Sequence, residues 1–288
     1  MPRTGFFHIP LYFSSEMCYC TYIATSSVTD GKWVTTRERR SIGLPAVWVL
    51  LQDAAYPGGF LFYGGSAMLD ILEYLRKNTY PGRGILAAGG CVCYFIMGRS
   101  ENSRNRIFVR TDDGIRTHAY DPARLQDPSL ILYHPVRRMG SALVVTNGDQ
   151  TDTICQAGEF RRALLARCYE PDAPNWTPRI SSIFYPDGRF SLSILRRATD
   201  GSCSRDFFDY ENCPAGTGYF ISTYQGDGNP LPSFEGEPEL VAIESENAEE
   251  FAGLIWDSLN EENKVSLFVR YIDLASGDTD DIIINKHN

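Results

Sequence analysis

A dense group of polar side chains lies in residues 98–106, GRSENSRNR. This segment follows an apolar run and places three arginines, two asparagines and two serines in one turn. Guanidinium groups donate paired hydrogen bonds in a fixed geometry that matches phosphate and carboxylate groups. Two interpretations therefore stand: a loop that holds an oxyanion-rich ligand, or a solvated loop whose arginines pair with nearby acids.

A second polar segment, residues 146–152 (TNGDQTD), joins an apolar strand to an expected helix. The first turn of a helix leaves backbone N–H groups free, and these can face an anion or a polar ring. For Asp149 and Thr151 the favoured interpretation is ordinary helix capping. Asn147 and Gln150 need another explanation, so they are candidates for ligand contact.

Residues 170–179 combine two carboxylates, an amide, an aromatic ring and an arginine in a loop with three prolines. Prolines restrict the unfolded chain, so such a loop orders its side chains at low entropic cost. Glu170 is a candidate general base if burial shifts its pKa towards neutrality. A structural ion pair between Glu170 and Arg179 is an equal alternative. Residues 222–224 and 226–230 also join a strand end to a polar turn, and there a plain turn is favoured.

Composition and charge argue against several classes of protein. The chain has 288 residues, and 27 Lys and Arg against 36 Asp and Glu give a net charge of −9. This acidic balance argues against a general nucleic-acid or anionic-membrane surface, so local arginines must hold any anionic ligand. The sequence contains no Gly-x-Ser-x-Gly motif, phosphate-binding loop or dinucleotide fingerprint, and no histidine stands in a setting for a catalytic triad.

The eight cysteines include no Cys-x-x-Cys pair, and no histidine stands at zinc-ligand spacing from them. We therefore expect a reduced, cytoplasmic protein without a metal site. Cys91 and Cys93 stand two apart in an apolar run, which predicts two small core residues on one strand face. Pro10 and the lack of a small-residue cleavage site argue against a signal peptide, and polar residues within residues 44–63 interrupt a membrane span.

From residue 68 onward, the apolar pattern predicts hairpins with few helices. Ile71, Leu72 and Leu75 recur at helical spacing after Asp70. Strands are expected at residues 85–97 with a turn at 89–90, and at 107–110, 116–120, 130–133, 142–146, 181–184, 190–195, 219–224, 240–243, 265–274 and 282–284, with further helices at 151–166 and 247–260. This order of elements predicts an α+β fold of layered, mainly antiparallel sheets.

Residues 1–67 lack a core-forming pattern and precede Met68, where an amphipathic helix is expected to begin. Residues 63–68 (YGGSAM) are compatible with a ribosome-binding sequence across the two glycine codons, shortly before a start codon. We expect either a leader read in frame, with translation starting at Met68, or an extension or accessory lobe with little order. The catalytic domain is expected to span residues 68–288.

Six short motifs, taken in order, resemble the stand-alone archaeal and bacterial IMP cyclohydrolases: residues 80–84 (YPGRG), 99–106, Tyr133, 147–152 (NGDQTD), 169–172 (YEPD) and 177–180 (TPRI). Residues 227–237 and 258–270 resemble the bacterial branch in particular. The resemblance implies the four-layer αββα fold of the N-terminal-nucleophile hydrolases. It also implies closure of the second purine ring of a formamidoimidazole-carboxamide ribonucleotide to IMP, with neither metal nor cofactor.

The resemblance further implies roles for individual residues. Glu170 is expected to transfer the proton, with Tyr133 and Arg106 near the formyl oxygen. The other expected substrate contacts share polar side chains: Arg83, Arg99, Ser100, Asn105, Asn147, Gln150, Arg179 and Tyr224. Among them, the two asparagines are assigned to the carboxamide or base, and the arginines to the phosphate or the charge of the intermediate. The expected partner is this nucleotide, with no nucleic acid or membrane, and a homo-oligomer is compatible with the fold.

Two other functions stand beside this one. An amidohydrolase on the same layered fold requires a nucleophile, but the strand after residues 80–82 begins at Arg83 rather than at a processed Ser, Thr or Cys. A catalytically silent purine-nucleotide-binding module would use the same loops without proton transfer by Glu170. A covalent acyl adduct supports the first alternative, and binding without turnover supports the second.

Overall fold

The computed structural model describes residues 3–12, 17–29, 32–38, 62–63, 66–129, 131–211, 213–243, 245 and 247–287, with side chains from residue 68 onward. The chain divides into two compact units, Met1–Ser66 and Ala67–Asn288. In the first unit, β1 (Arg3–Tyr12), β2 (Met17–Thr29) and β3 (Lys32–Glu38) form an antiparallel sheet. The short strands β4 (Phe62–Tyr63) and β5 (Ser66–Ala67) form a two-stranded sheet, and β5 contains the last residue of the first unit and the first of the second. Residues 39–61 of the expected leader or extension lie outside the described residues, and that expectation stays a prediction.

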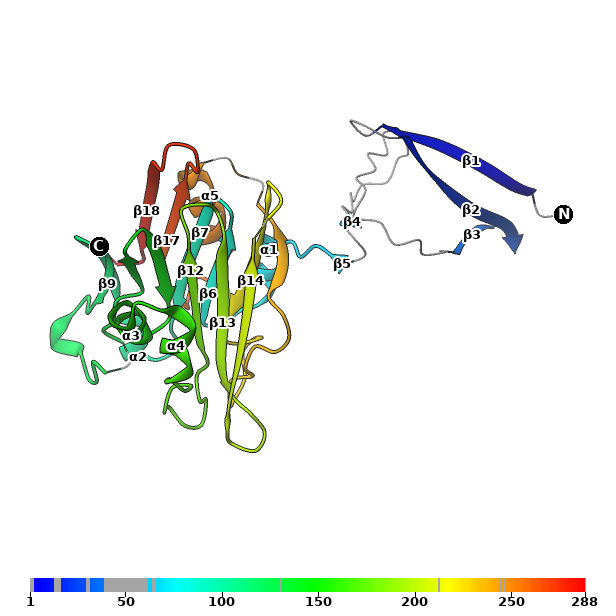
Figure 1. Cartoon of the computed structure of the whole chain (residues 1–288). Coiled ribbons are helices and arrows are strands. Elements are labelled where there is room, and N and C mark those ends of the chain that lie inside the picture. Colours follow the sequence, from blue (N-terminus) through cyan, green and yellow to red (C-terminus); the bar gives the residue numbers. More distant parts are fainter. Residues whose placement is uncertain are drawn as a thin grey trace. The chain divides into compact units, whose positions relative to one another are not determined.

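Two antiparallel sheets form the second unit (Figure 1). The order in the seven-stranded sheet is β14 (Cys203–Tyr210), β13 (Phe190–Arg197), β12 (Arg179–Phe184), β11 (Ala142–Thr146), β10 (Val136–Met139), β9 (Gly114–His118) and β8 (Ile107–Thr111). The order in the six-stranded sheet is β16 (Glu239–Ala242), β15 (Thr217–Ser222), β6 (Arg83–Ala88), β7 (Cys91–Met97), β17 (Lys264–Ile272) and β18 (Thr279–Asn285). The helices are α1 (Ile71–Lys77), α2 (Glu101–Arg104), α3 (Gln150–Ala157), α4 (Phe160–Leu165) and α5 (Ala248–Ser258), with a 3₁₀ turn at Pro122–Arg124.

Three apolar clusters join these elements into four layers. Between the sheets, side chains of β6 and β7 meet those of β11, β12 and β13. On the outer face of the six-stranded sheet, Leu75 of α1 and Phe251 of α5 enter a second cluster. On the outer face of the other sheet, Ile154 of α3 and Leu164 of α4 enter a third. This helix–sheet–sheet–helix arrangement confirms the expected α+β sandwich.

The β6–β7 hairpin is apolar on both faces because helices cover one face and the second sheet covers the other. Leu86, Cys91 and Cys93 belong to the cluster beneath α1 and α5. Ile85 and Tyr94 alternate with them and point into the cluster between the sheets. The two thiols are free and buried on one strand face, as predicted.

Some predicted elements are wrong. Residues 151–166 form two helices rather than one, because Gly158 ends α3 in a left-handed conformation with φ of 66°. Residues 131–133 form a turn rather than a strand, and Leu130 lies outside the described residues. Strands β10 and β14 were not predicted, since their charged residues interrupt the apolar alternation that marks a strand.

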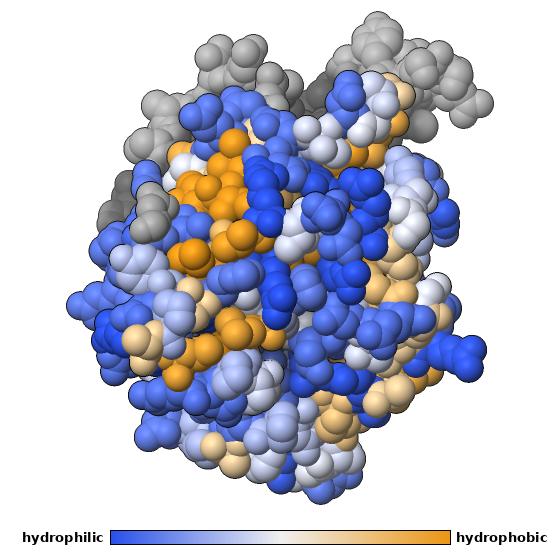
Figure 2. Space-filling model, turned by 90° about the vertical axis from the view of Figure 1, so that its left-hand side faces the viewer, coloured by the Kyte–Doolittle hydropathy of each residue, from blue (hydrophilic) through white to orange (hydrophobic). Residues whose placement is uncertain are grey.

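On the face in Figure 2, apolar surface gathers in patches between polar side chains. Among the residues whose side chains the structure describes, five large apolar side chains are exposed, and they belong to separate elements and loops: Val109, Tyr120, Leu165, Leu254 and Leu274. Scattered residues of this kind are ordinary on protein surfaces. Within the described ranges, no helix is long and apolar enough to span a membrane.

Candidate active site

Arg106 is a charged side chain that is fully buried directly after α2. Its Nε donates a hydrogen bond to the Ser103 carbonyl oxygen at 2.8 Å. Neither Nη1 nor Nη2 has a hydrogen-bond partner among the described residues. Burial, together with repulsion from the neighbouring Arg83, lowers the pKa of this guanidinium. A buried cation with two unpaired nitrogens is costly for a protein to keep, and it matches a ligand that brings negative charge or polar oxygens.

Arg83 opens β6 and is also buried, with 8% of its surface exposed. Its Nε likewise has no partner in the described part of the chain. Burial alone would lower the pKa of Arg83, but the attraction of Tyr80, Glu170, Tyr224 and further neighbours raises it. Arg83 therefore has a counter-charge within the protein, which leaves Arg106 as the less compensated of the two cations.

Tyr133 and Tyr94 connect the two sheets beside these arginines. Tyr94 lies on β7 and points into the cluster between the sheets, and its hydroxyl lies 2.8 Å from that of Tyr133. The backbone N–H of Tyr133 donates to the Thr117 hydroxyl at 2.8 Å, which fixes a residue that belongs to no strand. Tyr133 affects the pKa of both Arg83 and Arg106, so its phenol belongs to the same cluster.

Glu170 is 3% exposed, and burial raises the pKa of its carboxyl to about 7 against the lowering effects of Arg83 and Arg179. Its Oε1 lies 3.8 Å from Arg179 Nη1, too far for a hydrogen bond. The expected ion pair between Glu170 and Arg179 is therefore present, as a long contact without a hydrogen bond. A carboxyl with this pKa exchanges a proton readily near neutral pH.

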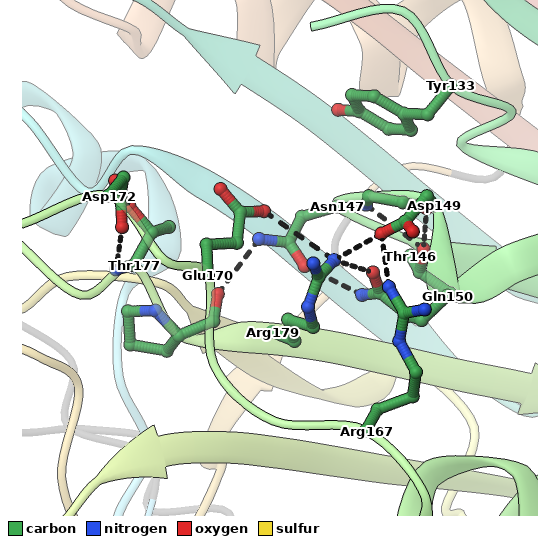
Figure 3. A network of polar contacts seen from close by, with 12 residues as sticks. Tyr133, Thr146, Asn147, Asp149, Gln150, Arg167, Glu170, Asp172, Thr177 and Arg179 are labelled. Carbon is green, nitrogen blue, oxygen red and sulfur yellow. Dashed lines mark hydrogen bonds and ion pairs between the residues drawn. The ribbon is translucent and has the colours of Figure 1, made fainter. Parts of the chain in front are cut away.

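A network of hydrogen bonds runs from Asn147 through Gln150 to Arg179 (Figure 3). Asn147 Oδ1 accepts from Gln150 Nε2 and from the Ile180 N–H, both at 2.9 Å, and its Nδ2 donates to the Pro178 carbonyl at 2.9 Å. Gln150 Oε1 accepts from Arg179 Nη1 at 2.7 Å. Asn147 and Gln150 are fully buried and bonded within the protein, so their geometry positions Arg179.

Asp149 completes this network rather than capping α3. It occupies the N-cap position without a side-chain capping hydrogen bond, so the favoured capping interpretation is wrong. Its Oδ1 instead lies 2.5 Å from Arg167 Nη2 and 2.8 Å from Arg179 Nη1, and these arginines hold the carboxyl pKa below its usual range against burial. Gly148 lies close to this network, since a Cβ there would lie 2.6 Å from Arg179 Nη1 and 2.7 Å from Gln150 Oε1.

A family model for IMP cyclohydrolase-like proteins matches residues 80–278. The chain belongs to this family. The match covers the whole seven-stranded sheet, the six-stranded sheet except β18, and the residues of the candidate site. A comparison with curated proteins finds no match.

In this family member, the remaining predicted contacts lie around Arg106. Arg99 is exposed, donates from Nη1 to Asp227 Oδ1 at 2.5 Å and lies over the Tyr80 ring at 5.1 Å. Ser100 caps α2 by accepting from the Ser103 N–H at 3.1 Å. Asn105 is buried, and its amide forms two hydrogen bonds with the backbone of Asp121, at 2.8 and 2.7 Å.

The predicted residues thus fall into three groups. Electrostatic interactions connect the members of the first group: Arg83, Arg106, Tyr133, Glu170 and Tyr224. The second group is the hydrogen-bonded network of Asn147, Gln150 and Arg179. Its Arg179 lies near the Glu170 carboxylate. Arg99, Ser100 and Asn105 belong to the 98–106 segment, where their side chains bond to exposed or backbone groups.

Tyr94 belongs to the site but was not predicted from the sequence. It stands in a run of apolar residues and is fully buried, so only its polar hydroxyl at an inward position marks it. Thr177 and Asp172 lay within a recognised motif but received no role. In the part of the chain that the structure describes, no three His, Cys, Asp or Glu side chains are grouped so as to hold a metal ion.

Proposed function

We propose that this protein closes the purine ring of the formamidoimidazole-carboxamide ribonucleotide to form IMP and water. The observation that carries the proposal is Arg106, whose two terminal nitrogens are buried and unpartnered in the described structure. Ring closure passes through an oxyanion at the former formyl oxygen, and fixed donors stabilise such a charge. Family membership supports cyclohydrolase chemistry at this site.

In the first step, the carboxamide nitrogen attacks the formyl carbon and a C–N bond forms. Glu170, as a carboxylate, accepts a proton from this nitrogen, and the carbonyl electron pair moves to the formyl oxygen. Arg106 and the Tyr133 hydroxyl donate to that oxygen. Holding both groups of one substrate in contact removes much of the entropic barrier to the attack.

In the second step, Glu170 returns its proton to the oxygen. The formamido nitrogen then loses its own proton by the same route, the C–O bond breaks, and water leaves as the C=N bond forms. The two hydrogens of the water thus come from the two reacting nitrogens. A carboxyl with a pKa of about 7 suits both directions of transfer, because neither of its charge states is strongly favoured at neutral pH.

The nucleotide phosphate is assigned to Arg99 and to Arg83. Arg99 lies at the surface and keeps donors available beyond its contact with Asp227. Arg179 is bonded to Gln150 and Asp149, so its proposed role is to place a positive charge near Glu170. Asn105, Asn147, Gln150 and Ser100 are proposed to shape the site rather than to contact the reacting atoms.

The test is an assay of purified protein with the formamido nucleotide, followed by the absorbance change of purine formation. Wild-type protein should turn over, and Glu170→Gln should lower kcat by about 10²-fold or more while nucleotide binding persists. Glu262→Gln is the matched control, since the Glu262 side chain is exposed.

Three results would contradict the proposal in different ways. A folded wild-type protein without turnover but with IMP binding by calorimetry would indicate a silent binding module. A covalent acyl adduct in intact mass spectra would indicate an amidohydrolase. Unchanged kcat in Glu170→Gln would remove Glu170 from proton transfer.

A further inference from the structure

The hydroxyl of Thr177 lies between a carboxylate and a phenol. Thr177 is buried, its hydroxyl donates to Asp172 Oδ2, and its oxygen lies 2.5 Å from the Tyr224 hydroxyl oxygen. The Thr177 backbone N–H donates to Asp172 Oδ1 at 2.6 Å, so the carboxylate contacts both donors of this threonine (Figure 3). Thr177 also anchors the catalytic loop, because its carbonyl accepts from the Glu170 N–H at 2.9 Å.

This arrangement permits one direction of hydrogen bonding. A carboxylate can only accept, so the single hydroxyl hydrogen of Thr177 must be directed to Asp172. The Thr177 oxygen then has only lone pairs for Tyr224, and the Tyr224 hydroxyl must donate to it. The opposite direction would leave two acceptor oxygens in contact without a hydrogen between them.

The hydrogen of Tyr224 is therefore used, and its oxygen keeps only the capacity to accept. Tyr224 is 1% exposed, its ring stacks on Tyr80 at 5.9 Å, and its charge acts on Arg83, so it lies in the cluster of the proposed site. No hydrogen bond to its hydroxyl other than that of Thr177 occurs in the described residues. Gly82 permits this packing, since a Cβ there would lie 2.5 Å from the Tyr224 ring.

We propose that Tyr224 accepts a hydrogen bond from the reacting amide nitrogen of the nucleotide, and that Asp172 and Thr177 are positioning residues which fix this direction. The proposal rests on the proposed function, since that nitrogen becomes N1 of the purine. IMP carries a hydrogen on N1, whereas AMP has a lone pair there. An acceptor at this position selects IMP and leaves AMP with two facing lone pairs.

Asp172→Asn tests the proposal, because it reverses three hydrogen bonds: that between residue 172 and the Thr177 hydroxyl, that between Thr177 and Tyr224, and that between Tyr224 and the ligand. The new side-chain oxygen keeps the bond from the Thr177 N–H, and the amide nitrogen takes the place of Oδ2 and donates to the Thr177 hydroxyl. Thr177 then donates to Tyr224, and Tyr224 must donate outward. Binding of IMP and AMP is measured by calorimetry for wild type, Asp172→Asn, Thr177→Ser and Thr177→Val.

Wild type and Thr177→Ser should bind IMP about 10-fold or more tightly than AMP, because mismatched polar atoms in a buried site are costly. Asp172→Asn should reverse this preference, and Thr177→Val should abolish it because the Tyr224 hydroxyl is released. Tyr224→Phe, which keeps the ring, should also show no preference. An unchanged preference in folded Asp172→Asn or Thr177→Val would overturn the inference, as would a wild type that prefers AMP. Failure of wild type to bind IMP would instead overturn the proposed function.

Discussion

Glu170 interacts with two groups of buried polar side chains that differ in how completely they are hydrogen bonded. Arg179 on one side is bonded to Gln150, Asp149 and the Cys168 carbonyl. Arg83 and Arg106 belong to the second group and retain nitrogens without partners among the described residues. Each group contains a buried arginine, so a buried guanidinium alone does not distinguish them.

The difference lies in what each group requires from outside the chain. The bonded group is complete by itself, which suits side chains that hold a loop and a charge in place. The unpartnered group is complete only when a ligand contributes oxygens, which suits side chains that contact substrate. Substitutions in the two groups should therefore have opposite effects on stability and activity, and this contrast can be tested.

The largest effect is expected for Arg106→Met. Loss of the oxyanion donors should lower kcat by about 10²- to 10³-fold. Thermal stability should stay unchanged or increase, because an uncompensated buried charge is replaced by an apolar chain of similar length. Arg104→Met is the matched control, since Arg104 lies in the same segment and is bonded to Gly98 and Asn263.

The result for Arg106→Met depends on measuring both kcat and the melting temperature. A strongly destabilised variant would show that Arg106 has partners within the protein and that the contrast between the two groups is wrong. The Arg104→Met control should lose some stability and keep most of its activity.

The second prediction concerns the pH dependence of stability caused by Glu170. Burial raises its pKa from 4.5 to about 7, so the folded protein favours the protonated carboxyl. The free energy of unfolding therefore has its full contribution from Glu170 below pH 4.5. This contribution is lost as pH rises towards 7, by about 3 kcal/mol in total. Glu170→Gln cannot ionise and should be more stable than wild type at pH 8, with the difference vanishing near pH 4.5.

Urea unfolding of both proteins across this pH range measures the effect. Glu262→Gln should follow wild type at every pH, because its carboxylate is exposed. A constant difference between Glu170→Gln and wild type would mean that Glu170 is ionised throughout and is paired more tightly than its 3.8 Å separation from Arg179 indicates.

The fold was largely predictable because its signals are local. The β6–β7 hairpin follows from an apolar run with Gly89 and Gly90 at its turn. The β8–β9 hairpin follows from the turn residues 112–114, and the α+β class follows from the order of such hairpins. Strand β14 was missed because its adjacent charged residues, Arg205 and Asp206, and its adjacent Phe207 and Phe208 break the apolar alternation in the sequence CSRDFFDY. The break at Gly158 was missed because the apolar spacing continues across both α3 and α4.

The sequence predicted which residues belong to the candidate site, but not which of them have unpartnered polar atoms and which are bonded within the protein. Asn147 and Arg106 both stand in polar segments, and the sequence treats them alike. The structure separates them, since Asn147 is bonded to the backbone of Pro178 and Ile180, whereas Arg106 keeps two unpartnered nitrogens. These differences depend on strand pairing between β11 and β12, which no local pattern specifies.

The third prediction tests the bonded group through Gln150→Met. This change removes an acceptor from Arg179 and donors from Asn147 and the Ile180 carbonyl while keeping the side-chain volume. Stability should fall by about 2 kcal/mol, because buried polar groups lose their partners. Gln225→Met is the matched control on the exposed surface and should change stability by less than about 0.5 kcal/mol. Equal effects of the two changes would show that the bonded network contributes little to stability.

The smallest effect is expected at Arg99, which belongs to neither group because it is solvent-exposed and paired with Asp227. Such surface pairs contribute about 0–1 kcal/mol, so Arg99→Gln should leave the melting temperature nearly unchanged. If Arg99 meets the nucleotide phosphate, the substitution should raise KM a few-fold at low ionic strength. The increase should then disappear in about 0.5 M salt, where exposed charges are screened.

Asp227→Asn provides the opposite perturbation at the same contact. It releases Arg99 from its acid, so KM should stay the same or fall, again only at low salt. A KM increase in Arg99→Gln that persists at high salt would place Arg99 with the buried, unscreened cations rather than at the rim. The substrate contacts of the arginines would then not depend on whether their nitrogens have partners within the protein. The unpartnered nitrogens of Arg106 would no longer mark it as a substrate contact.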